Sequence, residues 1–231
     1  MTLLECTNLT KKFSSRDALT DINLTIKGGH IIGLLGPNGS GKTTLLKLIT
    51  GLLTPTSGTI CVHEKPVGVS SKKVISYLPD HSYLNDWMKV REIIDMFEDF
   101  YEDFDTMKAY DMLSKLKINP NDKLKTMSKG TKEKVQLILV MSRRADLYIL
   151  DEPIAGVDPA ARDYIIETII SNYEETASIL ISTHLISDIE NILDEVIFIK
   201  DGKIQMHTTV EEIRETHNKS VDTMFREVFQ C

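Results

Sequence analysis

The spacing of apolar residues changes several times along the chain, and these changes predict an alternating series of strands and helices. Short alternating or fully apolar runs are typical of strands, and we expect strands at residues 3–9, 20–27, 30–35, 59–62, 74–78, 147–150 and 178–182. Helical patterns are found at residues 44–50, 91–117, 131–144, 160–173 and 185–193. Residues 196–205 predict a hairpin that turns at Asp201-Gly202, and the tail from Val210 is predicted to be helical.

Strands that alternate with helices indicate a parallel sheet covered on both faces. The stretch between about residues 80 and 145 differs, because it is mostly helical in pattern. One face of its 91–117 segment is apolar and aromatic, with Ile93, Ile94, Phe97, Phe100, Tyr101 and Phe104. The opposite face is acidic, which is more often a solvated surface than a metal site. Such an aromatic stripe is more often core than a binding groove. We therefore expect an inserted helical unit packed through its aromatic side, with a binding groove as the alternative.

Composition narrows the class of protein. The 231 residues are 42% hydrophobic and 26% charged, which is ordinary for a globular domain. A net charge of −7 argues against a broad nucleic-acid surface, which would need a basic face. No apolar run is long enough to span a bilayer, and no secretory signal pattern is visible. Cys6, Cys61 and Cys231 have no metal-binding spacing, and we interpret them as reduced thiols of a cytosolic protein.

A phosphate-binding pattern lies between the predicted strand 30–35 and the predicted helix 44–50. Its eight residues fit G-x-x-x-x-G-K-S/T, the Walker A loop: Gly36, Pro37, Asn38, Gly39, Ser40, Gly41, Lys42 and Thr43. The glycines let backbone N–H groups surround phosphate oxygens, and the helix that begins at Thr44 directs its dipole at them. We expect Lys42 to reach the β- and γ-phosphates and Thr43 to offer its hydroxyl to Mg²⁺. The pattern predicts that the chain binds a nucleoside triphosphate.

Two acidic residues, Asp151 and Glu152, directly follow the predicted strand 147–150. The carboxyl ends of buried strands are where open α/β sheets present ligands. Beside the phosphate loop, Asp151 is expected to hold Mg²⁺, directly or through water, and Glu152 to polarise the attacking water. The alternative is an exposed acidic pair in a turn.

With these residues, the chain resembles the ATP-binding subunits of ABC transporters over nearly its whole length. Further stretches match motifs of that family in order: the adenine-stacking aromatic residue at Phe13, the Q-loop at 74–83, the signature at 127–131 with Ser128 and Gly130, the D-loop at Asp158 and the switch histidine at His184. The resemblance implies an α/β fold, a P-loop NTPase core with a mostly parallel sheet, an antiparallel β subdomain and an inserted helical subdomain. ATP and Mg²⁺ are the implied ligands.

The resemblance also implies boundaries within one ABC-type domain, 1–231. Residues 1–79 and 146–215 would form the catalytic core with the β subdomain. Residues 80–145 would form the helical subdomain, and 216–231 a helical tail.

Two subunits of such a protein would close head to tail around two ATP molecules. A helix N-terminus carries about half a positive charge, so the helix that begins at residues 128–131 suits a γ-phosphate. The resemblance implies that this phosphate is bound at the Lys42 site of the opposite subunit. Ser128 and Gly130 of one subunit would thus complete the nucleotide site of the other. The other catalytic residues would be Glu152 and His184, the latter bonding the γ-phosphate and the attacking water.

Two positions depart from the family's common pattern. Asp80 stands where the Q-loop usually has Gln. A carboxylate ligates metal more strongly than an amide but cannot donate a hydrogen bond. Asp80 therefore either replaces Gln as a metal ligand, which we favour, or belongs to a loop whose role is mechanical and which transmits the nucleotide state to a partner. Lys129, within the signature, is either a source of extra stabilisation for transition-state charge or a solvated lysine.

The leading hypothesis is an ATPase subunit that energises a separate membrane permease, peripheral at the inner, cytoplasmic face of the membrane. Its partners would be a second ATPase subunit, identical or different, and the permease, which would dock near Tyr83, Leu84, Trp87 and Met88. The resemblance also suggests export, through the Ser-Lys-Gly signature and the short tail. The alternatives are a soluble ABC-type ATPase acting on nucleic acid or ribosomes, which the acidic composition disfavours, and a regulatory module that binds ATP without turnover.

Overall fold

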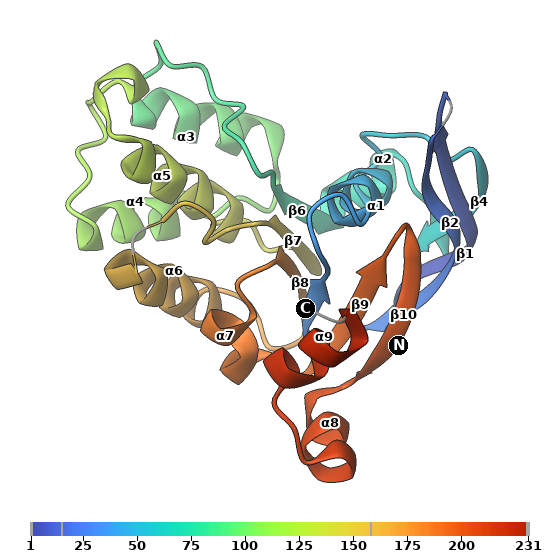
Figure 1. The fold of residues 1–231 in the computed structure, drawn as a ribbon. Helices are drawn as coiled ribbons and strands as arrows, with labels where there is room; N and C mark the ends of the chain where they lie inside the picture. The colour runs from blue at the N-terminus through green and yellow to red at the C-terminus, as the bar shows by residue number, and fades with distance from the viewer. Residues whose placement is uncertain (1, 15, 158, 230–231) are drawn as a thin grey trace.

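The computed structural model of the chain describes residues 2–14, 16–157 and 159–229. Within these residues, two β-sheets and a set of helices build an α/β fold, with helices against both sides of the larger sheet (Figure 1).

The larger sheet has six strands in the order β10-β9-β3-β8-β7-β6. Its strands are β3 (Ile31–Leu35), β6 (Ile75–Leu78), β7 (Leu147–Asp151), β8 (Ser178–Thr183), β9 (Glu195–Lys200) and β10 (Lys203–Thr209). All neighbouring pairs are parallel except β9 and β10, which form a hairpin. Every residue of β3, β7 and β8 is buried, which explains why their sequences are near-continuous apolar runs. The prediction of a mostly parallel sheet is confirmed.

The two faces of this sheet belong to different parts of the core, because successive side chains of a strand point to opposite sides. In β3, Ile32 and Leu34 pack with α1 (Lys42–Ile49) and the smaller sheet. Ile31 and Leu35 pack on the other side, with the remaining helices. The sheet is therefore covered on both faces, as predicted.

The smaller sheet is antiparallel and has the order β2-β1-β4-β5. Its strands are β1 (Thr2–Phe13), β2 (Arg16–Lys27), β4 (Ser57–Val62) and β5 (Lys65–Pro66). The antiparallel sheet that the resemblance implied is thus present, and it covers α1.

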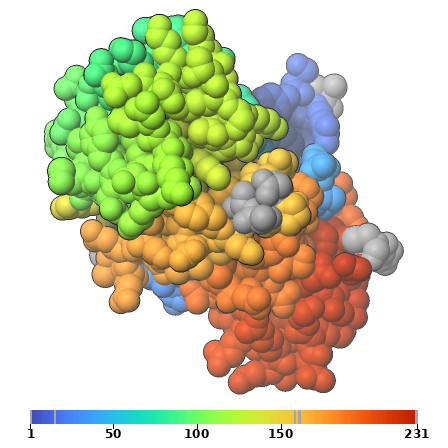
Figure 2. All heavy atoms as spheres, turned by 90° about the vertical axis from the view of Figure 1, so that its left-hand side faces the viewer, coloured from blue at the N-terminus to red at the C-terminus, as the bar shows by residue number. Residues whose placement is uncertain are grey.

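The helices after β6 gather into one lobe, which Figure 2 shows in green above α6 and α7. The lobe contains α3 (Val90–Phe100), α4 (Thr106–Lys115), a 3₁₀ turn (Leu124–Thr126) and α5 (Lys129–Met141). The other helices are α2 (Val69–Val74), α6 (Pro159–Ser171), α7 (Ile186–Ile189), α8 (Val210–His217) and α9 (Val221–Phe229). Of the helices in the described ranges, none combines the length and the apolarity needed to cross a bilayer.

The helical pattern at 91–117 is divided in the structure, because α3 and α4 are separate helices. The Asp105 carboxylate accepts a hydrogen bond from the Lys108 N–H at 2.9 Å, so it caps α4 and starts a new helix. The aromatic stripe is only partly core. Phe97 is buried and packs 5.5 Å from the Tyr101 ring, whereas Phe100 is 77% exposed.

The other differences are smaller. The predicted helix at 185–193 is α7 followed by a 3₁₀ turn, Glu190–Ile192. The short α2 was not predicted. The hairpin is confirmed, since Asp201 and Gly202 have φ values of 48° and 71°, as a type I′ turn requires. The helical tail is confirmed too, and Phe225 of α9 packs 5.7 Å from the Phe198 ring in β9.

One buried arginine joins the lobe to the strand β6. The side chain of Arg143 is 4% exposed. It donates to the carbonyl oxygens of Ile75 at 2.7 Å and Lys73 at 2.8 Å, and to the Asp103 carboxylate at 3.1 Å. Its guanidinium carbon lies 3.9 Å from the centre of the Tyr101 ring.

We predict that Arg143→Ala lowers the free energy of unfolding by about 3–5 kcal/mol, because the half-buried Asp103 carboxylate and two carbonyls lose their buried donor. Arg144→Ala is the matched control. The Arg144 side chain is 65% exposed and pairs with Asp105, so its loss is expected to cost far less, because solvent screens an exposed ion pair. Urea unfolding followed by circular dichroism measures both. Equal losses for the two variants would contradict this role of Arg143.

Candidate active site

The phosphate loop connects the end of β3 to the start of α1, and its path requires glycine. Gly39 and Gly41 have φ values of 80° and 110°, which side chains rarely allow. At Gly36, a Cβ atom would lie 2.3 Å from the carbonyl oxygen of Ile199 in β9. The loop can therefore lie close to the neighbouring strand only because this position has no side chain.

The β9–β10 turn holds the loop in place. The Gly202 N–H donates to the Ser40 carbonyl at 2.9 Å, and the Thr20 N–H donates to the Gly202 carbonyl at 2.8 Å. The hairpin thus connects the phosphate loop to β2 through backbone hydrogen bonds.

Lys42 is the cation of this loop, and it is 6% exposed. Its ammonium donates to the carbonyl oxygens of Gly36 at 2.7 Å and Pro37 at 3.3 Å, and lies 3.8 Å from Glu152 Oε1. Burial lowers the pKa of Lys42, and the negative charges of Glu152 and Asp151 oppose that shift. These neighbours keep a positive charge where the phosphate tail is expected to lie.

Asp151 ends β7 and is 1% exposed. The Ser182 hydroxyl donates to its Oδ1 at 2.5 Å, while Oδ2 is buried without a hydrogen-bond partner among the described residues. Burial raises the pKa of the Asp151 carboxyl, and the hydroxyls of Ser182 and Thr43 counteract the rise.

A buried carboxylate oxygen with no partner fits a cation ligand. Among the described residues, no group of three His, Cys, Asp or Glu side chains is placed to hold a metal by itself. Mg²⁺ fits such a sparse set, because it is usually bound by one or two carboxylates together with substrate phosphates. The donors at this position, Asp151 and Thr43, therefore suit Mg²⁺ that arrives with a nucleotide.

Glu152 and His184 lie at the ends of adjacent strands, β7 and β8. Glu152 Oε2 is 2.9 Å from His184 Nδ1, and the Glu152 side chain is 16% exposed. The Glu152 N–H donates to the carbonyl of Ser182 at 3.0 Å. Its φ of 53° is left-handed, which is uncommon for a residue with a side chain. The backbone thus holds Glu152 between Lys42 and His184.

A cavity of about 350 Å³ opens over these groups. Its walls join the phosphate loop and the start of α1 to β1, β2 and the strand ends, and are made by Phe13, Arg16, Ala18, Asn38, Gly39, Gly41, Lys42, Thr43, Thr44, Asp80 and Glu152. Phe13 is 45% exposed at the rim, with the Lys11 ammonium 4.9 Å from its ring centre. Gly36, Pro37 and Ser40 of the loop do not line this cavity.

Arg16 is a lining residue that the sequence patterns did not indicate. Its guanidinium donates to the Gly39 carbonyl at 3.3 Å. It belongs to no motif, so only the pairing of β1 with β2 brings it to the phosphate loop. Its position shortly after Phe13 was the one available signal.

Asp80 does lie at the cavity, and its side chain is 42% exposed. Its Oδ1 is 2.5 Å from Nδ1 of His81. The negative charge of Asp80 also contributes to the raised pKa of Asp151, after the larger effect of burial. The Q-loop carboxylate therefore lies near the other predicted metal ligands.

The signature residues lie apart from this cavity. Ser128 caps α5 by accepting a hydrogen bond from the Thr131 N–H at 3.2 Å. No atom of the described residues lies within 4 Å of the position of a Cβ at Gly130, so this surface is open to that extent. Lys129 is 82% exposed and lies 3.8 Å from Glu133. One subunit thus does not bring Ser128 and Gly130 to the phosphate loop, and Asp158 lies outside the described residues.

Comparisons with known proteins agree with this geometry. Residues 19–155 match the protein family described as ABC transporter. The ABC transporter ATP-binding protein YtrB of Bacillus subtilis (strain 168) is 32% identical over 220 residues, which cover 94% of this chain and 75% of YtrB. The SkfA peptide export ATP-binding protein SkfE of the same strain is 30% identical, over 93% of this chain and 92% of SkfE.

The fold has a close match among solved structures. An ATP-binding subunit of an ABC transporter superimposes with a TM-score of 0.89 and 26% identity, over 99% of this chain and 100% of that one. The chain belongs to the ABC transporter family of ATP-binding proteins.

Proposed function

We propose that the chain binds and hydrolyses ATP through the site built around Lys42 and uses this energy to drive transport through a separate membrane permease. The observation that carries the proposal is the contact series Lys42–Glu152–His184. It places a cation, a carboxylate and an imidazole in succession at the phosphate loop. These are the groups that hydrolysis of a γ-phosphate needs for charge stabilisation and for activation of water.

Different residues of the cavity bind different parts of the nucleotide. Phe13 stacks on the adenine, and the backbone N–H groups of residues 36–43 surround the phosphates. Lys42 exchanges its carbonyl partners for β- and γ-phosphate oxygens. Support comes from the exposed ring of Phe13 at the cavity rim and from the buried ammonium at its base.

Thr43, Asp151 and Asp80 are the residues that would hold Mg²⁺. When bound, Mg²⁺ neutralises charge on the β- and γ-phosphates. Support comes from the unpaired Oδ2 of Asp151 and from the positions of Thr43 and Asp80 on the wall of the same cavity.

Glu152 orients and deprotonates the attacking water. His184, 2.9 Å from Glu152, holds that carboxylate in place and bonds the γ-phosphate. Because Lys42 lies 3.8 Å from the same carboxylate, the phosphate tail enters between a fixed cation and a fixed base.

A second subunit completes the site by placing its own signature helix over the γ-phosphate. In this chain Ser128 and Gly130 lie on an open surface at the start of α5, where they are accessible to a partner. Dimer closure around two ATP molecules is then the step that transmits force, and hydrolysis releases it. Lys129, on the same surface, remains either an added positive charge for that site or a solvated side chain.

The permease partner places the chain at the cytoplasmic face of the membrane. SkfE, which this chain resembles over most of its length, is named as a peptide export protein, and export is the direction we propose. Residues 80–145 would be the helical subdomain that meets the permease. Of the docking candidates, Tyr83 and Trp87 are exposed, whereas Leu84 and Met88 pack against the core.

We predict that Glu152→Gln lowers ATP turnover by about 10²–10⁴-fold, because the amide cannot accept the proton of the attacking water. The shape of the side chain is kept, so ATP and Mg²⁺ should still pair two subunits. Steady-state phosphate release and light scattering measure the two effects. Lys42→Ala is the control and should lose turnover and pairing together. Full turnover in Lys42→Ala would overturn the assignment.

A second prediction concerns the Q-loop. Asp80→Gln should lower ATP turnover by less than about tenfold, since an amide oxygen also ligates Mg²⁺, whereas Asp80→Ala should lower it by about 10–100-fold. The Mg²⁺ concentration for half-maximal turnover should rise in Asp80→Ala. Equal and severe losses in both variants would show that the carboxylate is not interchangeable with the amide.

A further inference from the structure

The guanidinium of Arg16 lies at the nucleotide cavity and has few partners of its own. Arg16 is exposed, and its Nη2 donates to the Gly39 carbonyl at 3.3 Å, which is a long hydrogen bond. Within the described ranges it forms no ion pair, and the neighbouring Asp17 carboxylate pairs with Lys12 instead, at 3.3 Å. A guanidinium carries five N–H donors in a planar fork, so Arg16 retains donors for a ligand.

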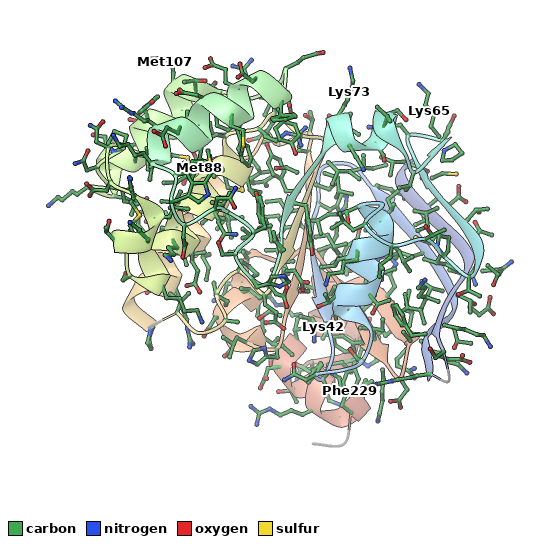
Figure 3. All side chains as sticks on the ribbon, turned by 90° about the horizontal axis from the view of Figure 1, so that it is seen from above. Lys42, Lys65, Lys73, Met88, Met107 and Phe229 are labelled. Atoms are coloured by element: carbon green, nitrogen blue, oxygen red, sulfur yellow. The ribbon has the colours of Figure 1, made fainter. Side chains whose placement is uncertain are left out.

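Arg16 and Lys42 are the two basic residues among those that line this cavity. Two carboxylates, Asp80 and Glu152, line the same walls. Because these carboxylates repel an anion, a phosphate chain in the cavity gains from each cation that it can reach. The two cations lie on different sides of it. Lys42 lies at the start of α1 (Figure 3), whereas Arg16 lies on the side of β1 and β2.

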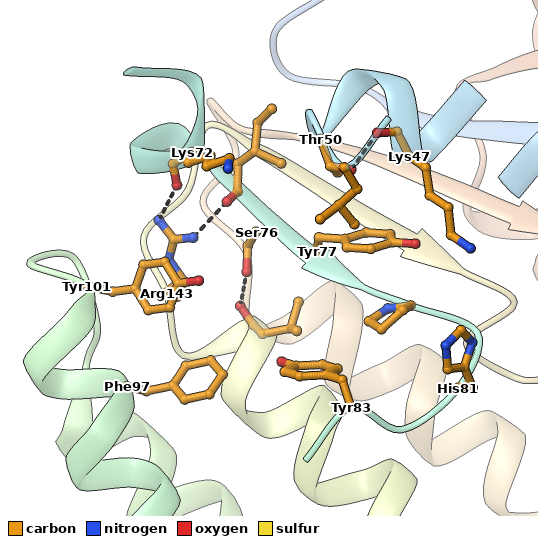
Figure 4. Close-up of a pocket in the computed structure, with 14 residues that line it drawn as sticks. Lys47, Thr50, Lys72, Ser76, Tyr77, His81, Tyr83, Phe97, Tyr101 and Arg143 are labelled. Atoms are coloured by element: carbon orange, nitrogen blue, oxygen red, sulfur yellow. Dashed lines mark hydrogen bonds between the residues drawn. The ribbon is translucent and has the colours of Figure 1, made fainter. Parts of the chain in front are cut away.

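The adjoining cavity does not supply a cation to the nucleotide. That cavity, of about 480 Å³, lies between the core and the helical lobe, and Lys47, Lys72 and Arg143 are among its lining residues (Figure 4). Among the described residues, none lines both cavities. Arg16 is therefore the cation that the fold brings to the phosphate loop in addition to Lys42.

The pairing of β1 with β2 sets the position of Arg16 along a bound nucleotide. Phe13 and Arg16 are directly opposite each other in the two strands, so their side chains leave the sheet on the same side. The hydrogen bond to Gly39 also places the guanidinium beside the phosphate loop. Lys42 and Glu152 are in contact where the γ-phosphate is expected. Arg16 thus lies between the positions proposed for the base and for the γ-phosphate.

We propose that Arg16 is a nucleotide-binding residue that donates to the α- and β-phosphates, the anionic part that ATP and ADP share. The inference rests on the proposed function, from which it takes the direction of the bound nucleotide. On binding, the guanidinium exchanges its long bond to Gly39 for bonds to phosphate oxygens, which are stronger because both partners are charged. Arg16 therefore sets the affinity for ATP and for the product ADP alike.

The test measures how adenosine, AMP and ADP displace a fluorescent ADP analogue from the full chain. We expect Arg16→Ala to weaken AMP and ADP binding by about tenfold, the effect of losing one hydrogen bond to a charged group, and to leave adenosine binding unchanged. Arg16→Lys should retain much of the affinity. Arg16→Gln, which can still donate to the Gly39 carbonyl, should not. Added salt should reduce the difference between the wild type and Arg16→Ala, because it screens the exposed charge.

Steady-state ATP turnover gives a second readout. The KM of Arg16→Ala should rise by about the same factor while kcat changes by less than about threefold, because the contact is equally strong in the ground state and in the transition state. Lys65→Ala is the matched control, since it removes the same charge. Lys65 is exposed on β5 of the same small sheet, and Figure 3 shows it well apart from Lys42. Its ADP affinity and KM should stay at the wild-type values.

Three results would overturn the inference. Unchanged AMP and ADP affinity in Arg16→Ala would show that the guanidinium does not bind phosphate. Wild-type affinity in Arg16→Gln would reduce Arg16 to a support of Gly39. A loss of kcat at unchanged KM would place Arg16 at the γ-phosphate. Displacement of the analogue needs neither hydrolysis nor a permease, so a failure of the proposed function would appear separately, in a wild-type chain that binds no ADP or in the turnover of the Lys42 and Glu152 variants.

Discussion

The rest of the structure depends on one buried cation. The Lys42 ammonium is held by two backbone carbonyls of its own loop and faces the Glu152 carboxylate at 3.8 Å. A buried charge is costly unless it is paired and hydrogen-bonded, so the loop must fold back until its carbonyl oxygens point at the lysine ammonium. This conformation of the loop needs glycine at position 36, where the Ile199 carbonyl lies close to the backbone. It is also held by the hydrogen bond from the Gly202 N–H in the hairpin turn to the Ser40 carbonyl.

The parallel sheet explains why the other groups meet the lysine. β8 is the neighbour of β3, β7 is the neighbour of β8, and all three strands are parallel, so Asp151, Glu152 and His184 lie at the same edge of the sheet although His184 is far along the chain from the other two. The sequence indicated this position for Asp151 and Glu152, because they follow an apolar run of strand length, whereas His184 was assigned through the resemblance. The order of strands was not in the sequence pattern, and neither was Arg16, which reaches the cavity through the pairing of β1 with β2.

Failures of sequence-based prediction occurred where distant contacts outweigh local pattern. The 91–117 segment has a continuous helical period, yet the chain leaves the helix between Tyr101 and Asp105. There Arg143, some forty residues away, stacks on Tyr101 and binds Asp103, while Asp105 caps the next helix. Phe100 falls at the end of α3 and points to solvent although its spacing suited the core. Periodicity indicates which residues share a face, and it contains no information about a buried arginine from the segment that follows α5.

The same arginine, Arg143, connects the helical lobe to the strand that leads to Asp80. Arg143 binds the carbonyl of Ile75 at the start of β6, and β6 ends directly before Pro79 and Asp80. Pro79 fixes its own φ, so the end of β6 leads into Asp80 along a restricted backbone path. The negative charge of Asp80 contributes to the raised pKa of Asp151, after the larger effect of burial. Asp80, at a position where the resemblance led us to expect glutamine, therefore adds a negative charge near Asp151 at the end of the strand that Arg143 holds.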